Sequence, residues 1–179
     1  MSAEENNARI AREFITEARR LLSEEYLPKI ERSVERLTDE QIWWRPNEQS
    51  NSIGNLILHL CGNARQWIVS GLGGEKDERK RDTEFAERRI LPRQQLLAHL
   101  RELITDVETT LTKFDAARLS DEFLIQGTNT TALVAILHVT EHFSMHTGQI
   151  ILLTKMLAQI DLRFYDFKNG KPVHTWVKA

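Results

Sequence analysis

The sequence carries three histidines at four-residue intervals, His138, His142 and His146, inside a long apolar stretch. A step of four residues returns an α-helix to nearly the same face, because the helix has about 3.6 residues per turn. A fourth histidine, His59, lies in another apolar segment far upstream. Neutral imidazoles are common ligands of transition metals, so the pattern indicates a metal site between two helices.

Three histidine ligands suit a catalytic ion better than a structural one, because three protein ligands leave room for water or substrate. Such an ion would activate water or stabilise the thiolate of a small cosubstrate. The imidazoles alone do not choose among zinc, nickel, copper and iron(II). Simpler interpretations also exist: His59 as a solvated side chain, and His138 as a core histidine hydrogen-bonded to a neighbouring group.

The residues around His59 on a helical projection are polar but uncharged, and Arg65 is the only charged residue from 51 to 74. A solvent-facing helix surface normally carries Lys and Glu, so this face resembles the lining of a polar cavity. We expect the following residues to orient the metal ligands or to line a substrate pocket: Asn55, Asn63, Gln66, His138 and Gln149. Cys61 lies on the opposite side of this helix and is expected to be a small buried apolar residue.

The apolar positions recur with a helical period through most of the chain. They predict helices over about residues 4–37, 52–72, 92–114 and 131–157. Pro28 is expected to bend or break the first of these. Asn169-Gly170 lies between two short aromatic-rich arms, which is typical of a type I′ hairpin. The sequence therefore predicts one domain over residues 1–179, an all-α four-helix bundle (about 4–158) with a short C-terminal β-hairpin (about 162–177).

Two further segments have alternative interpretations. Residues 75–89 are dense in charge of both signs, which favours a solvated connection over a lid or an anion clamp made by Arg79, Arg81, Arg88 and Arg89. The last long helix carries only Glu141 as a charged residue between positions 131 and 154. A helix with so little charge is covered on more than one side, either by the hairpin or by a second subunit. We expect a homodimer.

Composition excludes several classes of function. The 179 residues carry a net charge of only −2, and no basic stripe indicates a nucleic-acid partner. No segment reaches 18 uninterrupted apolar residues, and the polar start lacks the apolar core of a signal peptide. With Cys61 as the only cysteine, no internal disulfide can form. We expect a cytoplasmic protein that acts on a small molecule, without a membrane or nucleic-acid partner.

The segments around these histidines resemble the DinB/YfiT-like superfamily of bacterial metal-binding four-helix proteins. The resemblance rests on His59 within residues 55–63 and on His142 and His146 within residues 141–149, and residues 37–46, 51–55 and 81–85 are similar to an uncharacterised branch. It implies His59, His142 and His146 as ligands of one divalent metal, with His138 outside the triad. Nickel and zinc are the first candidates, with iron and manganese next, and a dimer is common.

The resemblance also implies a class of chemistry, since relatives in this superfamily transfer or isomerise substrates with low-molecular-weight thiols. A thiol S-transferase-like activity is therefore the first functional hypothesis, and metal-dependent hydrolysis is the second. A bundle that binds a metal or small molecule without turnover, or that binds another protein, is the alternative from a different class.

Overall fold

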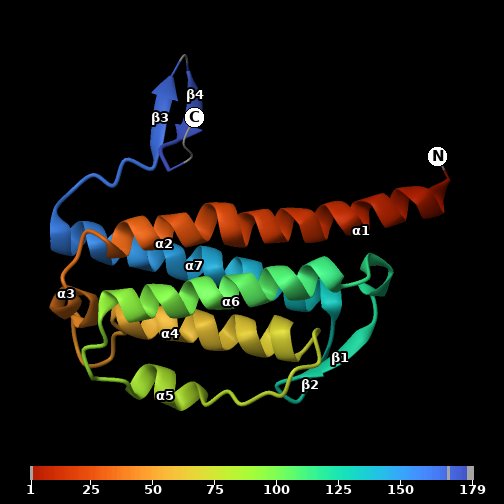
Figure 1. Ribbon diagram of the computed structural model, residues 1–179, viewed down its shortest axis with the longest axis horizontal. Helices are drawn as coiled ribbons and strands as arrows, with labels where there is room; N and C mark the ends of the chain where they lie inside the picture. The colour runs from red at the N-terminus through yellow and green to blue at the C-terminus, as the bar shows by residue number, and fades with distance from the viewer. Residues whose placement is uncertain (1, 169, 177–179) are drawn as a thin grey trace.

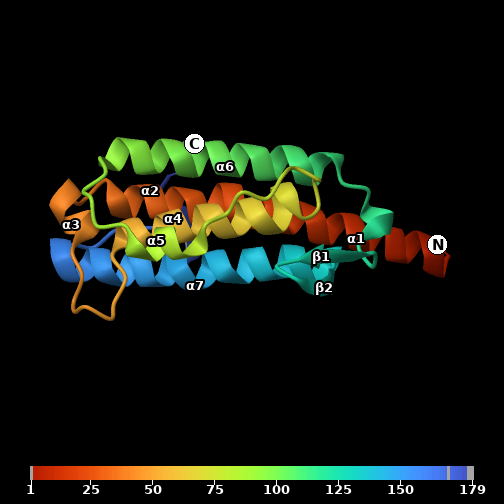
Figure 2. The ribbon, with the colours of Figure 1, turned by 90° about the horizontal axis from the view of Figure 1, so that it is seen from below.

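The computed structural model describes residues 2–168 and 170–176, which are mostly helical. The long helical segments lie side by side (Figures 1 and 2). Their buried apolar side chains form one core cluster. In chain order the helical elements are α1 (Ala3–Arg20), the π-helical η1 (Leu21–Tyr26), α2 (Leu27–Val34), α3 (Asp39–Trp43), α4 (Ile53–Ala64), the π-helical η2 (Arg65–Ser70), α5 (Arg81–Ala86), α6 (Arg93–Lys113), the 3₁₀ turn η3 (Ala116–Arg118) and α7 (Ala132–Ala158).

The long helices contact one another in a ring: α2 packs on α6, α6 on α4, α4 on α7 and α7 on α2. The helix predicted over about residues 92–114 is confirmed as α6, and its large apolar residues are buried: Leu96, Leu97, Leu100, Leu103, Ile104, Val107 and Leu111. In Figure 1, α4 and α6 run in the same direction. The connection between them, residues 71–92, must therefore return along the length of the bundle, and it carries α5 past α4.

Pro28 does not break the helical segment, because α1, η1 and α2 follow one another without a gap. It lies in the first turn of α2, directly after η1, whose wider turn accommodates a residue without a backbone N–H. Four residues before Pro28, the carbonyl of Glu24 accepts a hydrogen bond from Trp176 Nε1 at 3.1 Å. The proline thus contributes to the site where the C-terminal hairpin docks.

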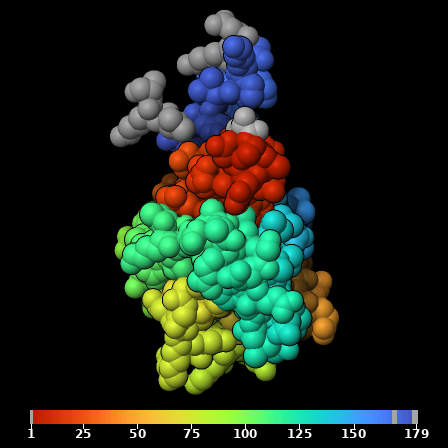
Figure 3. All heavy atoms as spheres, turned by 90° about the vertical axis from the view of Figure 1, so that its right-hand side faces the viewer, coloured from red at the N-terminus to blue at the C-terminus, as the bar shows by residue number. Residues whose placement is uncertain are grey.

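The C-terminal hairpin pairs β3 (Tyr165–Lys168) with β4 (Lys171–His174), in antiparallel register, and confirms the predicted strand pair. It lies on η1 and α2, through His174 Nε2 to Glu25 at 3.0 Å and Lys29 Nζ to the Tyr165 hydroxyl at 2.9 Å. Seen end-on in Figure 3, the hairpin stands on the α1 side, away from the yellow start of the 71–92 connection. Asn169 of the predicted turn lies outside the described residues, as does residue 177.

The prediction of an all-α bundle needs one correction, because a second hairpin precedes α7. Strands β1 (Glu122–Ile125) and β2 (Thr128–Thr131) pair in antiparallel register around Gln126-Gly127. Both turn residues have positive φ, 53° and 73°, which is the backbone of a type I′ turn.

Within residues 2–168 and 170–176, no helix is long and apolar enough to cross a membrane.

Candidate metal centre

The structure brings His59, His142 and His146 together between α4 and α7. The His59 ring centroid lies 4.8 Å from that of His142 and 5.3 Å from that of His146, and the latter two lie 4.4 Å apart. One ring nitrogen from each of the three lies within 4.8 Å of the other two. His59 and His146 are buried and His142 is half-buried. Residues more than eighty positions apart thus present their imidazoles to one point.

Each buried histidine of the cluster has a partner on the nitrogen that faces away from it. His146 Nδ1 lies 2.7 Å from Gln149 Oε1, and His59 Nδ1 lies 2.9 Å from Glu84 Oε2. An amide oxygen and a carboxylate oxygen only accept hydrogen bonds, so these contacts place a proton on each Nδ1. The Nε2 lone pairs of both rings then remain available.

His142 Nε2 lies 2.8 Å from His59 Nε2. Since the Nε2 of His59 carries a lone pair, His142 donates this hydrogen bond. That proton must move to Nδ1 before His142 can bind a metal through Nε2. In the metal-free protein, the His142–His59 hydrogen bond thus joins the same two Nε2 atoms that would both bind a shared ion.

The cluster disfavours positive charge. Burial lowers the pKa of His142, and the neighbouring His146 and His59 lower it further, to about 3. Burial also lowers the pKa of His146, although the hydrogen bond to Gln149 opposes this effect. At neutral pH both rings are therefore uncharged, as a metal ligand must be.

The donor set fits a divalent transition metal. Three imidazoles converge, no carboxylate oxygen belongs to the same group of ligand atoms among the described residues, and the combination of one half-buried and two buried rings leaves one side accessible. Nitrogen donors of this kind favour nickel, zinc or iron(II) over magnesium or calcium, which prefer oxygen.

His138 lies beside the triad but faces a different group. Its Nε2 accepts a hydrogen bond from Asn63 Nδ2 at 3.2 Å, and its ring lies between Trp67, at 4.2 Å, and His142, at 5.3 Å. Burial lowers its pKa, and Glu141 opposes this. His138 thus packs against the side of His142, with its Nε2 used by Asn63.

The charge-rich connection is not simply a solvated loop. Arg79 and Glu84 are buried side by side, with Arg79 Nε 2.8 Å from Glu84 Oε1 and Arg79 Nη2 2.9 Å from Glu84 Oε2. Burial raises the pKa of Glu84, but hydrogen bonds from Arg79 and His59 outweigh this effect and hold the pKa below its usual value. The prediction that residues 75–89 form a solvated connection is therefore wrong at Arg79 and Glu84.

The arginines of the alternative interpretation, an anion clamp, mostly contact other groups of the protein. Arg88 Nη1 donates to the backbone oxygen of Phe85, and Arg89 pairs with Glu87. The guanidinium of Arg81 lies 5.0 Å from the centre of the Phe85 ring, which packs 4.6 Å from the His59 ring. Arg81 is exposed, and its contact with Phe85 places it at the outer edge of the centre.

The remaining predicted pocket residues take different places. Gln66 links the connection to the β1–β2 turn, because its Oε1 accepts hydrogen bonds from Arg79 Nη1 at 2.9 Å and Gln126 Nε2 at 2.5 Å. Asn55 is buried, and its side chain bonds Ser52 and the backbone oxygens of Glu84 and Glu87, so it fastens α5 to α4. Cys61 is buried as expected, and burial raises the pKa of its thiol.

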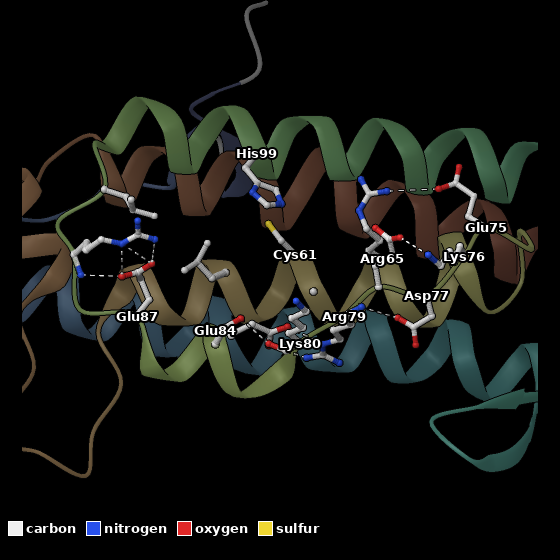
Figure 4. A pocket seen from close by; sticks show the side chains of 16 residues that line it. Cys61, Arg65, Glu75, Lys76, Asp77, Arg79, Lys80, Glu84, Glu87 and His99 are labelled. Atoms are coloured by element: carbon white, nitrogen blue, oxygen red, sulfur yellow. Dashed lines mark hydrogen bonds and ion pairs between the residues drawn. The ribbon is translucent and has the colours of Figure 1, made fainter.

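Figure 4 shows the side chains that line a cavity between α4, α6 and the 71–92 connection, with the Arg79–Glu84 pair among them. Its volume is about 590 Å³, and its lining includes Cys61, His99, Arg79 and Glu84. His59, His142 and His146 are not among the residues that line this cavity. The Arg79–Glu84 pair, which lines the cavity and also contacts His59, therefore lies between the cavity and the histidine cluster.

Sequence reasoning missed Glu84 and Arg79 as parts of the centre. One signal was present, since Phe85 is the only large apolar residue between 76 and 89. A single aromatic residue in a charged segment indicates a point where the segment docks, and Glu84 is its neighbour. Which carboxylate of the segment would reach His59 was not readable, because it depends on the path of the connection.

Comparisons with known proteins agree with this fold. The sequence family described as "Protein of unknown function (DUF1572)" matches residues 9–171. A DinB-like protein from Bacillus cereus ATCC 10987 is similar in structure, with a TM-score of 0.59, 17% identity and coverage of 74% of this chain and 85% of that chain. A conserved protein from Enterococcus faecalis has a TM-score of 0.58 and 14% identity, covering 86% of this chain and 98% of that one. No functionally curated protein matches the sequence.

Proposed function

The chain belongs to the DUF1572 family and has a DinB-like fold, and from this premise we propose that it is a metal-dependent protein acting on a small molecule. His59, His142 and His146 hold one divalent transition metal, with nickel and zinc as the first candidates and iron or manganese next. The observation that carries the proposal is the convergence of three imidazoles from α4 and α7, of which His142 and His146 are uncharged at neutral pH.

The activity that we propose is thiol S-transfer, in which a low-molecular-weight thiol attacks an electrophilic carbon. When bound, the metal supplies a Lewis acid that stabilises the thiolate. Gln149 orients His146, and the half-buried edge at His142 gives access for the cosubstrate. Buried Cys61, with its raised pKa, is not the nucleophile.

Metal-loaded protein is expected to accelerate conjugation of glutathione or another low-molecular-weight thiol to chlorodinitrobenzene. In this reaction an S–C bond forms, the C–Cl bond breaks, chloride leaves and the thiol proton passes to solvent. Absorbance of the product measures the rate. Removal of the metal by a chelator should abolish the enzymatic rate, and metal readdition should restore it.

A rate equal to that of the uncatalysed reaction with every thiol would contradict S-transfer with these substrates. Hydrolysis of a p-nitrophenyl ester by the same metal-loaded protein would then favour the hydrolase, which needs no thiol. Stoichiometric metal without either activity would favour a binding module. These three outcomes separate the alternative functions.

We also propose that a second copy of the chain covers α7. The exposed apolar side chains of this helix form a face along its length, and they are 40–60% exposed: Leu133, Val134, Leu137, Met145, Leu152 and Met156. The hairpin lies on η1 and α2, so it is not the cover considered from the sequence. Ser144 is also exposed on α7, whereas Thr140 and Thr147 are buried.

The charges on this face are self-complementary. A Cβ at Gly148 would meet no atom within 4 Å, so two helices can approach closely there. In an antiparallel pair with its two-fold axis beside Gly148, Glu141 of one copy lies opposite Lys155 of the other, because both are seven residues from the glycine. An exposed apolar face that contains a complementary pair of charges is typical of an interface.

Leu152→Glu is expected to convert the dimer to a monomer at micromolar concentration, because it places charge on the apolar face. Ile10→Glu is the matched control, since Ile10 is an exposed residue of α1 away from this face. Glu141→Lys and Lys155→Glu should each weaken the dimer, and the double variant should restore it. Sedimentation velocity measures the mass, and a monomeric wild type would overturn the proposal.

The cytoplasmic location of the protein, expected from its single cysteine, stays a prediction.

A further inference from the structure

The ion pair between Arg79 and Glu84 is unusual because both of its side chains are buried. Their side chains are only 5% and 9% exposed. Removing two charges from water costs about as much as their attraction returns, so a buried ion pair adds little net stability. The stability of the fold does not explain why the 71–92 connection places these charges against α4.

The direction of the hydrogen bonds suggests the explanation. Both Glu84 Oε2, at 2.9 Å, and Arg79 Nη2, at 3.2 Å, approach Nδ1 of His59. A guanidinium only donates, so Nδ1 either donates to Glu84 or accepts from Arg79. Arg79 Nη2 already donates to Glu84 Oε2 at 2.9 Å, and the carboxylate is the closer partner of Nδ1. Nδ1 therefore donates to Glu84, which fixes the tautomer whose Nε2 can bind a metal.

The position of Glu84 is fixed from three sides. A Cβ on Gly62 would lie 1.9 Å from Glu84 Oε1 and 3.0 Å from Arg79 Nε, so only glycine allows the pair to lie against α4. Gln66 Oε1 accepts from Arg79 Nη1 at 2.9 Å. Asn55 Nδ2 donates to the backbone oxygen of Glu84 at 2.9 Å. Such over-determined placement is expected for a group that must orient another side chain.

We propose that Glu84 is the positioning residue that orients His59 for metal binding. Arg79 holds its carboxylate, and the absence of a side chain at Gly62 leaves room for it. The inference rests on the proposed function, because it assumes that His59 is a ligand. The 71–92 connection then has a role in the metal centre although it supplies no ligand. A carboxylate bonded to the outer nitrogen of a ligating histidine typically changes metal affinity by about 10- to 100-fold.

The test measures Co²⁺ binding by competition with a chromophoric chelator, together with the visible d–d spectrum of the Co²⁺-loaded protein. Glu84→Gln keeps the size of the side chain but removes the charge that holds Nδ1–H, so affinity should fall about 10- to 100-fold and the spectrum should shift. Glu84→Asp should recover part of the loss. Gly62→Ala should weaken binding in the same way, because its methyl group displaces Glu84.

Glu87→Gln is the matched control, since Glu87 is a carboxylate of the same connection that pairs with Arg89 instead of a histidine. It should leave the affinity and the spectrum unchanged. Unchanged Co²⁺ affinity and spectrum in Glu84→Gln would overturn the positioning role while leaving the metal site intact. A wild-type protein that binds no Co²⁺ would overturn the metal site itself, and the inference with it. Circular dichroism shows whether each variant is folded.

Discussion

Replacement of His146 by alanine is expected to weaken binding of Ni²⁺ or Zn²⁺ by about a hundred- to a thousandfold. Structural zinc sites with four ligands bind with about 10–16 kcal/mol, which corresponds to about 2.5–4 kcal/mol for each ligand. His146 is buried, and Gln149 holds its Nδ1, so its Nε2 is the donor that is lost. Isothermal titration of untagged protein measures the change.

Two histidine variants are matched controls for this experiment. His99 is an exposed residue of α6 outside the cluster, so His99→Ala should bind metal as the wild type does. His138→Ala should keep most of the affinity, because Nε2 of His138 is bonded to Asn63 and lies outside the triad. His146→Gln provides a second variant if the alanine variant unfolds. Full metal content in both His146 variants would contradict the assignment.

Acid is expected to destabilise the metal-free protein through the histidine cluster. The pKa of His142 is about 3 in the folded protein, whereas an unfolded histidine has a pKa near 6.5. Above pH 6.5 the ring is neutral in both states and contributes nothing. As pH falls from 6.5 toward 3, the unfolded chain binds a proton that the folded protein does not, so stability decreases. The shifts of His138 and His146 act in the same direction.

Chemical denaturation of wild type and His142→Gln in the presence of a chelator measures this effect. The full shift of His142 corresponds to several kcal/mol, but the ring is half-exposed, so we expect about 2 kcal/mol between pH 7 and pH 4. The variant lacks this titration. The stability difference between the two proteins should therefore change in favour of the variant as pH falls. A difference that stays constant over this range would contradict the neutral-histidine interpretation.

The helical scaffold was largely predictable because its signals are local. The apolar period located α6 and its entire buried face, and capping boxes at Ser2 and Thr38 marked the starts of α1 and α3. The β1–β2 hairpin was missed because Gln-Gly is a weaker turn signal than Asn-Gly, and because Thr131 caps α7 and was assigned to the helix alone. Propensity does not decide such short segments; the packing around them does.

The metal-ligand candidates were predictable for a similar reason, since a four-residue spacing fixes the relation of His142 to His146. Bringing His59 to them required only that α4 and α7 be neighbours. Glu84 was not predictable, because its place depends on how the 71–92 connection crosses α4 and on the absence of a side chain at Gly62. Contacts that depend on the path of a long connection leave no periodic pattern in the sequence.

An anomalous-scattering map of crystals of untagged protein, recorded at the absorption edges of nickel and zinc, tests the central claim most directly. We predict one strong peak between the rings of His59, His142 and His146, within about 2.0–2.2 Å of one nitrogen from each. A map without a peak at this point from protein supplied with both metals, or with its peak on other residues, would contradict the account.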